Sequence, residues 1–291
     1  MSKRFKVIVY IVAGLLFINL TFLGYGHFFL KSGVPQGHLR VVFLDVGQGD
    51  AILVQSFQGY NVLIDGGPDK DVIYRLDQYV PFYNRRIDLL ISTHEDLDHI
   101  TGLVEVLKRY KVKKILTNGL KNFSPAAMEW EKLIKQKNIP RQVIDAPLDV
   151  ILDKQTFLQF FWPQQELTKD LKGDDNFASL VFKLKHGNNR FLFTGDADKK
   201  TEEELIKLGC DLKADVLKVG HHGSKYSSDI DFLRLIEPKY GVLSVGENNP
   251  FGHPSLRVLK NLEEVNVKIL RTDQMGDIVF LSDGKNLSLT F

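Results

Sequence analysis

The chain has 291 residues, 44% of them hydrophobic and 25% charged, which is typical of a globular protein with one catalytic domain and a small appendage. A net charge of +2 excludes a broad polybasic surface, so overall charge gives no support for tight nucleic-acid binding. The single cysteine, Cys210, excludes a disulfide partner or a thiolate zinc site within the chain.

Residues 1–30 are predicted to anchor the chain in the cell membrane. Residues 7–26 carry no charge, follow a basic segment and are long enough to cross a bilayer as a helix. The basic flank should stay in the cytoplasm, which predicts a single-pass protein with an extracytoplasmic domain. Secretion after cleavage of a signal peptide is the alternative, although residues 23–28 offer no convincing cleavage site. Residues 31–38 are predicted to be a linker.

From Leu39 onward the sequence consists of short β-rich runs and amphipathic segments. Two runs separated by a short glycine-containing turn predict a hairpin, and the second of them ends at Asp65. The expected elements are strands at 39–46, 51–56, 60–64, 87–91 and 112–116, and helices ending at Tyr79, at 100–110 and at 125–137. Residues 39–291 are therefore predicted to form the catalytic domain.

The loop between the fourth strand and the second helix concentrates polar ligands. Within its six residues stand His94, Asp96, Asp98 and His99. Imidazole and carboxylate together suit a divalent transition metal, and the short spacing lets the side chains converge. A charged turn that caps the next helix is the alternative, but a cap needs only one or two polar residues. The loop therefore predicts a metal site.

The second half of the chain repeats this order. Residues 177–185 and 190–194 predict another hairpin, whose second strand also leads to an aspartate, Asp196. A helix at 199–208 and a strand at 214–219 follow, and the strand leads into His221 and His222. The repeat predicts an α/β fold in which two similar sheets lie face to face, a four-layer α/β/β/α sandwich. Its site is expected where strand ends from both halves meet.

These motifs resemble the metallo-β-lactamase superfamily and, within it, the hydrolase domain of the competence protein family ComEC/Rec2. The matching segments are 43–51, 63–67, 94–99, 176–181, 194–196 and 217–224. The wider superfamily has His-x-His-x-Asp-His as its first motif, whereas Asp96 replaces the middle histidine here, and a later histidine is replaced near Asn176. Both departures look like those of the ComEC-like branch. The resemblance implies a metallo-β-lactamase-like domain behind the N-terminal transmembrane helix.

The resemblance also implies two divalent metal ions, zinc or manganese. His94 and Asp96 would hold one ion, Asp98 and His99 the other, and Asp196 would bridge them. Either His221 or His222 would complete the second site, and its neighbour would support a ligand or face the substrate. The residues expected to support ligands or contact substrate are Asp50, Asp65, Asn176, Ser224 and Lys225, although Asp65 could equally be only a turn residue.

The ligand types predict the metal and the chemistry. A carboxylate oxygen is harder than an imidazole nitrogen, so Asp96 favours manganese or magnesium more than a histidine-rich site would, while zinc also fits. Two neighbouring ions would activate water for attack on a phosphorus or carbonyl centre, with Asp98 expected to be essential. The leaving group needs a proton, for which His222, His253 and Lys225 are candidates. His253 could instead be a helix-start residue.

The resemblance implies cleavage of phosphodiester bonds, with DNA as the first candidate, because ComEC-like domains are associated with degrading one strand of incoming DNA. A small or cell-wall phosphodiester, such as a phosphorylcholine ester, is the alternative, and a non-catalytic interaction module of a DNA-uptake system is a third. The membrane channel of a DNA-uptake protein is not expected here. Candidate phosphate or base contacts are Lys108, Arg109, Lys111, Lys113, Lys114, Trp162, Tyr226 and Phe251.

Overall fold

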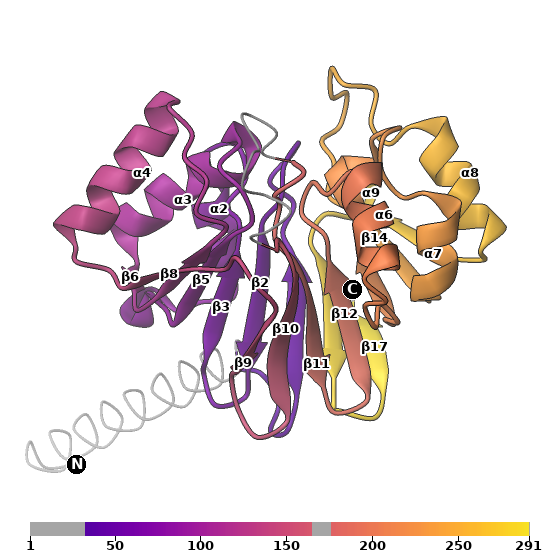
Figure 1. Ribbon diagram of the computed structural model, residues 1–291. Helices are drawn as coiled ribbons and strands as arrows, with labels where there is room; N and C mark the ends of the chain where they lie inside the picture. Colours follow the sequence, from indigo (N-terminus) through magenta and orange to yellow (C-terminus); the bar gives the residue numbers. More distant parts are fainter. Residues whose placement is uncertain (1–32, 165–175, 291) are drawn as a thin grey trace, which may run out of the picture.

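The computed structural model describes residues 33–164 and 176–290 (Figure 1). The predicted membrane anchor at residues 1–30 lies outside these residues, as does the start of the predicted linker. Among the helices of the described ranges, none is long and apolar enough to cross a membrane.

Two β-sheets form the centre of the domain. The first contains β1 (Leu39–Phe43), β2 (Ile52–Ser56), β3 (Asn61–Ile64), β5 (Leu89–Ser92), β7 (Ile115–Thr117), β8 (Arg141–Val143), β16 (Ile278–Ser282) and β17 (Leu287–Thr290). The second contains β9 (Leu148–Ile151), β10 (Thr156–Trp162), β11 (Val181–His186), β12 (Asn189–Phe193), β13 (Val216–Lys218), β14 (Tyr240–Leu243) and β15 (Lys268–Arg271). Their orders are β17-β16-β1-β2-β3-β5-β7-β8 and β15-β14-β13-β12-β11-β10-β9.

Helices cover the outer face of each sheet (Figure 1). On the first sheet lie α2 (Asp71–Leu76), α3 (Leu97–Arg109) and α4 (Pro125–Gln136); on the second lie α6 (Lys199–Lys207), α7 (Ile230–Ile236), α8 (Leu256–Glu264) and the short α9 (Thr272–Met275). Strand side chains alternate between the two faces of a sheet. In β3, Leu63 packs against the helices of the first sheet, whereas Val62 and Ile64 face the core between the sheets. Phe43, Phe182 and Phe193 lie in this shared core. The predicted four-layer sandwich is confirmed.

The predicted repeat is also present. In the first half, β2 and β3 are antiparallel, and β3, β5 and β7 are parallel neighbours. In the second half, β11 and β12 are antiparallel, and β12, β13 and β14 are parallel neighbours. Because parallel strands end at the same edge of a sheet, each half delivers its loops to one edge.

The structure corrects several boundaries. The predicted strand at 87–91 is divided into β4 (Arg86–Ile87) and β5. Between them the buried carboxylate of Asp88 pairs with Lys113 at 2.7 Å and accepts the amide of Asn61. The predicted strand at 112–116 is likewise divided into β6 (Lys111–Val112) and β7. Finally, β16 and β17 return to the first sheet beside β1, a placement that the repeat does not predict.

Candidate metal centre

Helix α3 begins inside the loop predicted to hold the first group of ligands. Asp96 is its N-cap residue, with extended backbone angles, and Asp98 and His99 lie in the first turn. The expectation that all four ligands stand in a loop is therefore wrong for these two. A helical turn fixes the direction of each side chain, and an acid there is stabilised by the helix dipole.

Two glycines allow α3 to approach the end of β3. A Cβ atom at Gly102 would lie 1.8 Å from the carbonyl oxygen of Gly66, and one at Gly66 would lie 2.5 Å from the amide of Leu103. The amide of Gly66 donates a hydrogen bond of 2.8 Å to the carbonyl of His99. Any side chain at either glycine would push α3, and His99 with it, away from the strand ends.

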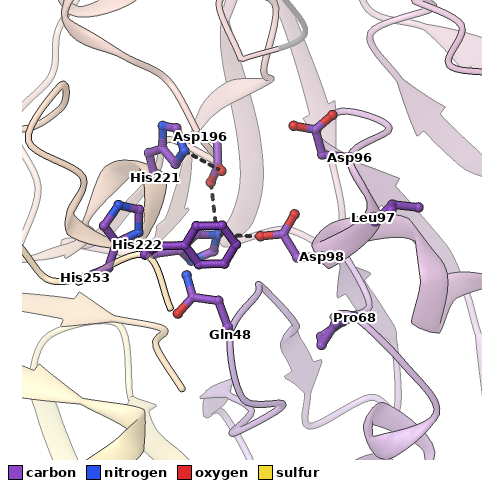
Figure 2. A pocket seen from close by; sticks show the side chains of 10 residues that line it. Gln48, Pro68, Asp96, Leu97, Asp98, Asp196, His221, His222 and His253 are labelled. Carbon is purple, nitrogen blue, oxygen red and sulfur yellow. Dashed lines mark ion pairs between the residues drawn. The ribbon is translucent and has the colours of Figure 1, made fainter. Parts of the chain in front are cut away.

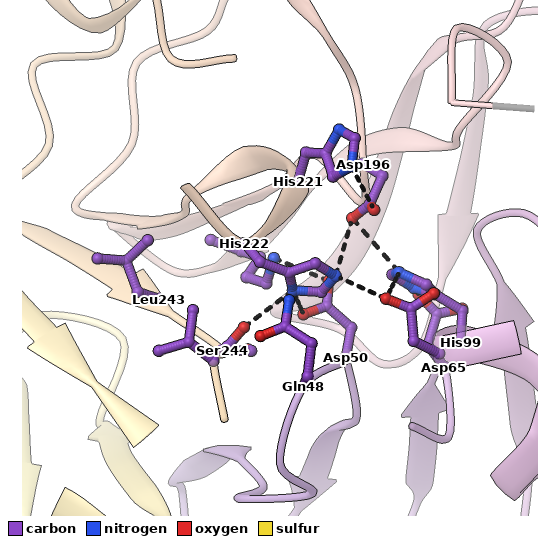
Figure 3. Close-up of polar contacts among 12 residues, drawn as sticks. Gln48, Asp50, Asp65, His99, Asp196, His221, His222, Leu243 and Ser244 are labelled. Carbon is purple, nitrogen blue, oxygen red and sulfur yellow. Dashed lines mark hydrogen bonds and ion pairs between the residues drawn. The ribbon is translucent and has the colours of Figure 1, made fainter. Parts of the chain in front are cut away.

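Four side chains converge between the two halves. Asp98, His99, Asp196 and His222 each offer one ligand atom, and these atoms lie within 4.8 Å of one another (Figures 2 and 3). Oδ1 of Asp196 is 3.3 Å from Nε2 of His99 and 3.5 Å from Nε2 of His222. Nε2 of His222 is also 3.2 Å from Oδ2 of Asp98. We call Asp98, His99 and His222 the second group.

This cluster leaves out three predicted ligands, His94, Asp96 and His221. Nε2 of His221 is 3.7 Å from Oδ2 of Asp196, and Nε2 of His94 is 3.6 Å from Oδ2 of Asp96. The rings of His94 and His99 have centroids 4.1 Å apart. We call His94, Asp96 and His221 the first group. Asp196 thus turns one oxygen toward each of the two adjacent histidines, and Figure 3 shows both contacts.

The backbone explains how two neighbouring histidines reach the same carboxylate. His221 and His222 lie in η2 (Gly220–Gly223), and both have left-handed φ angles, 47° and 52°. Such angles are unfavourable for residues other than glycine and persist only where neighbours hold them. The amide of His221 donates to the carbonyl of Gly195 at 3.2 Å, and the carbonyl of His221 accepts from Ser224 at 2.8 Å.

The donor set fits divalent metal ions. Within the described residues, Nε2 of His94, His99 and His222 and Oδ1 of Asp196 are buried and have no hydrogen-bond partner. Buried polar atoms are almost always satisfied, so the three of these that lie together, on His99, His222 and Asp196, indicate a ligand there. Imidazole nitrogens and carboxylate oxygens are suitable donors for zinc or manganese.

Three of the four histidines make a hydrogen bond through Nδ1, which leaves Nε2 free. Nδ1 of His99 lies 2.9 Å from Oδ2 of Asp65, which also accepts the hydroxyl of Thr93. Nδ1 of His94 is 2.9 Å from the hydroxyl of Thr93. Nδ1 of His222 donates to the carbonyl of Ser244 at 2.8 Å. Partners of this kind fix the ring and its tautomer in metal sites, so Asp65 lies where an orienting residue is needed.

The charges of the site favour bound cations. Burial alone would raise the pKa of Asp196, but the imidazoles of His222 and His99 outweigh burial and hold that pKa well below its usual range. Burial likewise opposes ionisation of Asp98, yet His99 and His222 lower its pKa. Both carboxylates are therefore ionised at neutral pH, and a metal ion bound there would take the place of the imidazole protons that otherwise offset their charge.

A hollow of about 450 Å³ opens over the two groups (Figure 2). Its lining residues are Gln48, Pro68, Asp96, Leu97, Asp98, Asp196, His221, His222, Phe251 and His253. The ring of His253 lies between those of His221 and Phe251, with centroid distances of 5.8 Å and 5.9 Å. Helix α8 begins later, with Ser255 as its N-cap residue, so His253 is a hollow-lining residue and does not start the helix.

None of the five predicted supporting residues lines this hollow, and three of them also lie apart from the imidazoles or meet the histidine loop only through the backbone. The ammonium of Lys225 is exposed and lies over the ring of Tyr226, 5.0 Å from its centroid. Ser224 is buried and supports the histidine loop through its amide. Asn176 accepts the amide of Ser179 through its backbone carbonyl. The structure therefore gives no contact that would make Lys225 a proton donor at the site.

The predicted basic cluster lies elsewhere. Lys108, Arg109 and Lys111 line a separate hollow of about 380 Å³ at the end of α3 that is farthest from Asp98. Lys108 and Arg109 both pair with Glu105. Cations at a helix C-terminus are stabilised by its dipole, which explains this placement without a ligand. Trp162 is buried and donates to the carbonyl of Phe177, so it cannot stack on a base.

Sequence reasoning missed four residues that the structure brings to the site. Thr93 and Ser179 contact Nδ1 of His94, and Ser244 contacts His222. Lys218 pairs with Asp50 directly behind His222. Lys218 had a detectable signal, because it is a charged residue in an otherwise apolar strand just before the histidine loop.

Comparison with known proteins supports the fold and the resemblance. The chain is 34% identical over 258 residues to "ComE operon protein 3" of Bacillus subtilis, covering 83% of this chain and 33% of that protein. It is 32% identical over 254 residues to "Competence protein ComA" of Neisseria gonorrhoeae, covering 86% and 33%. The chain therefore spans about a third of the length of these relatives.

A solved structure shows the same fold. The metallo-beta-lactamase fold protein YhfI from Bacillus subtilis superposes with a TM-score of 0.58 at 13% identity, covering 84% of this chain and 99% of that one. The family described as "Metallo-beta-lactamase superfamily" matches residues 44–247. The fold, the His and Asp groups and these matches agree with a metal-dependent hydrolase related to the ComEC competence proteins. The chain belongs to the metallo-beta-lactamase superfamily.

Proposed function

We propose that this protein hydrolyses phosphodiester bonds with the help of two divalent metal ions, and that DNA is its first candidate substrate. The observation that carries the proposal is the shared carboxylate. Asp196 turns Oδ2 toward His221 of the first group and Oδ1 toward His99 and His222 of the second. An acid that turns one oxygen toward each of these sets of histidines suits a two-ion site.

The residues of the chain would hold the reacting groups in place. His94, Asp96 and His221 would bind one ion, and Asp98, His99 and His222 the other. Ions bound there would supply positive charge that activates water and stabilises negative charge on a phosphoryl group. The partners behind the imidazoles, Asp65 among them, keep the ligands pointed at the hollow where the substrate would enter.

His253 is the candidate for proton transfer in the hollow. Among the described residues, its Nδ1 is buried and has no hydrogen-bond partner. Burial lowers the pKa of His253, and the nearby His221 lowers it further, so the ring is neutral at pH 7. A neutral imidazole accepts a proton more readily than it donates one. We therefore assign His253 a role in accepting a proton or contacting the substrate, in preference to that of general acid.

Two observations bear on the substrate. One relative is named "Competence protein ComA", which favours DNA. Phe251 is 66% exposed at the rim of the hollow, where an unpaired base could stack on it. The hollow of about 450 Å³ would also accept a small phosphodiester, which is the second candidate. We place the domain outside the cytoplasmic membrane, held by residues 1–30.

A metal-titrated activity screen tests the proposal. Metal-free protein is supplied with Mn²⁺ or Zn²⁺ and assayed on single-stranded DNA, RNA, small phosphodiesters and a β-lactam. We expect hydrolysis of phosphodiesters that depends on added metal, with single-stranded DNA cleaved faster than a small diester. The reverse ranking would favour the small substrate, whereas activity without metal would overturn the site.

A further inference from the structure

Lys218 occupies a strand position that alternation assigns to the core. It ends β13 and points to the same side as Val216, which lies in the apolar core between the sheets. The side chain of Lys218 is only 1% exposed. Lysine is almost never buried to this extent unless it is paired. The residue that pairs with Lys218 should therefore explain why a lysine stands at this position.

The partner is Asp50, which comes from the other half of the domain. Nζ of Lys218 lies 2.8 Å from Oδ2 of Asp50 and donates to the carbonyl of Val219 at 2.9 Å. The side chain of Asp50 is 2% exposed. Burying both charges costs solvation energy that their attraction does not reliably offset, so an apolar pair would often be as stable. Stability alone does not explain the pair.

Asp50 connects this ion pair to the metal centre. Its Oδ1 lies 3.6 Å from Nδ1 of His222, the nitrogen that donates to the carbonyl of Ser244 (Figure 3). The amide of Asp50 donates to the carbonyl of Asp98 at 3.3 Å. Asp50 therefore contacts two residues of the second group, one through its side chain and one through its backbone.

A comparison with Asp65 shows what Lys218 supplies. Asp65 lies behind His99 and accepts from the amide and the hydroxyl of Thr93, at 2.8 Å and 2.7 Å, besides its contact with the imidazole. Across the described residues, Oδ1 of Asp50 accepts no hydrogen bond, and Oδ2 contacts the ammonium of Lys218. Lys218 therefore holds the carboxylate of Asp50 in place, as Thr93 holds the carboxylate of Asp65.

We propose that Lys218 is a positioning residue for the second metal ion. Its ion pair fixes the carboxylate of Asp50 behind His222, and this carboxylate with the carbonyl of Ser244 keeps Nε2 of the imidazole aimed at Asp98 and Asp196. The inference rests on the proposed two-ion site. Residues that support a metal-binding histidine typically change the affinity for the metal about 10–100-fold.

The test is a Mn²⁺ titration of metal-free protein, followed by the electron paramagnetic resonance signal of free Mn²⁺. We expect Lys218→Met to weaken one of the two ions about 10–100-fold and to leave the other within about 2-fold. A matched control is Lys183→Met, because Lys183 is another buried lysine of the second sheet, paired at 3.1 Å with Asp211 away from the site. That control should lower stability and leave both affinities unchanged.

A double variant separates positioning from stability. Lys218→Met leaves Asp50 as a buried unpaired charge, and adding Asp50→Asn removes that charge. We expect the melting temperature of the metal-free protein to recover in the double variant while the affinity for the second ion stays low. Recovery of both would show that the pair is only structural. If Lys218→Met does not fold, Asp50→Asn alone should show the same loss of one ion, and native affinity there would overturn the proposal.

The readout also distinguishes this inference from the proposed function. If the native protein binds neither Mn²⁺ nor Zn²⁺, the two-ion site itself is refuted. If the native protein and Lys218→Met both bind two ions with equal affinity, only the positioning role fails. Neither result depends on which substrate the enzyme cleaves.

Discussion

The two halves of the metal centre are built from the same order of elements but hold their histidines by different means. In the first half, His99 lies in the first turn of α3, which is pressed against β3 through Gly66 and Gly102. In the second half, His221 and His222 lie in a loop with left-handed φ angles. A helix directs its side chains by regular geometry, whereas left-handed residues cost roughly 1–2 kcal/mol each and must be held by neighbours. The first half therefore depends on close backbone packing, and the second on surrounding contacts.

The largest effect is expected at Asp196, which contacts a histidine of each group. Asp196→Asn removes the charge between the two groups, so we expect both ions to bind much more weakly and hydrolysis to be lost. Asp98→Asn should also abolish hydrolysis but weaken only the ion of the second group. Metal titration and rate measurements on the two variants check this. Full activity of Asp98→Asn would contradict the two-ion mechanism.

His253, from the second half, lines the hollow but belongs to neither metal group. We expect His253→Ala to lower the rate of hydrolysis about 100-fold, as is typical when a proton-transfer group is removed. Lys225→Ala is the control, because Lys225 lies over Tyr226 and outside the hollow, and its rate should stay near that of the native protein. Steady-state kinetics on one phosphodiester compares them. A large loss in Lys225→Ala would restore it as a proton-donor candidate.

Gly102→Ala tests the packing of the first half. The added Cβ would overlap the carbonyl of Gly66, so α3 must shift. We expect the free energy of unfolding to fall by about 1–3 kcal/mol, the usual cost of overpacking. Lys108→Ala on the exposed end of the same helix should stay within about 0.5 kcal/mol. Denaturant unfolding of metal-free protein measures both, and equal values would show that α3 is not held by this contact.

Glu202 tests the contacts that hold the second half. It lies in α6 and accepts the amides of Ser228 and Asp229, just after the histidine loop. Burial raises the pKa of Glu202 from 4.5 to about 8. Between these values the folded state keeps a proton that the unfolded state has lost, so the free energy of unfolding should fall as pH rises from 4.5 to 8.

The matched variant isolates this contribution. Glu202→Gln keeps one acceptor oxygen for one of the two amides and cannot titrate, so it is expected to be less stable at every pH but to lack the pH dependence. We expect the free energy of unfolding of the native protein to fall more steeply with pH than that of Glu202→Gln. Urea unfolding of metal-free protein at several pH values between 4.5 and 8 measures the difference. Parallel curves would show that Glu202 is ionised in the folded protein.

Local patterns predict the hairpins and the histidine loops, because glycine turns, alternation and residue type are properties of neighbouring residues. The start of α3 is not predicted, since Asp96 and Asp98 suit a metal loop and a helix N-terminus equally well. The contacts of Ser244 with His222 and of Lys218 with Asp50 join segments remote in the chain, as does the pairing of β16 with β1. Only the packed structure shows such contacts.

The direction of β1 has a consequence for how the domain would face its surroundings. The strand runs from Leu39 toward the loop that carries Asp50, so the site lies beyond the far end of a strand about 16 Å long. A segment that enters at Leu39 reaches the domain on the side away from the hollow. If residues 1–30 anchor the protein as proposed, the hollow would open away from the point of attachment.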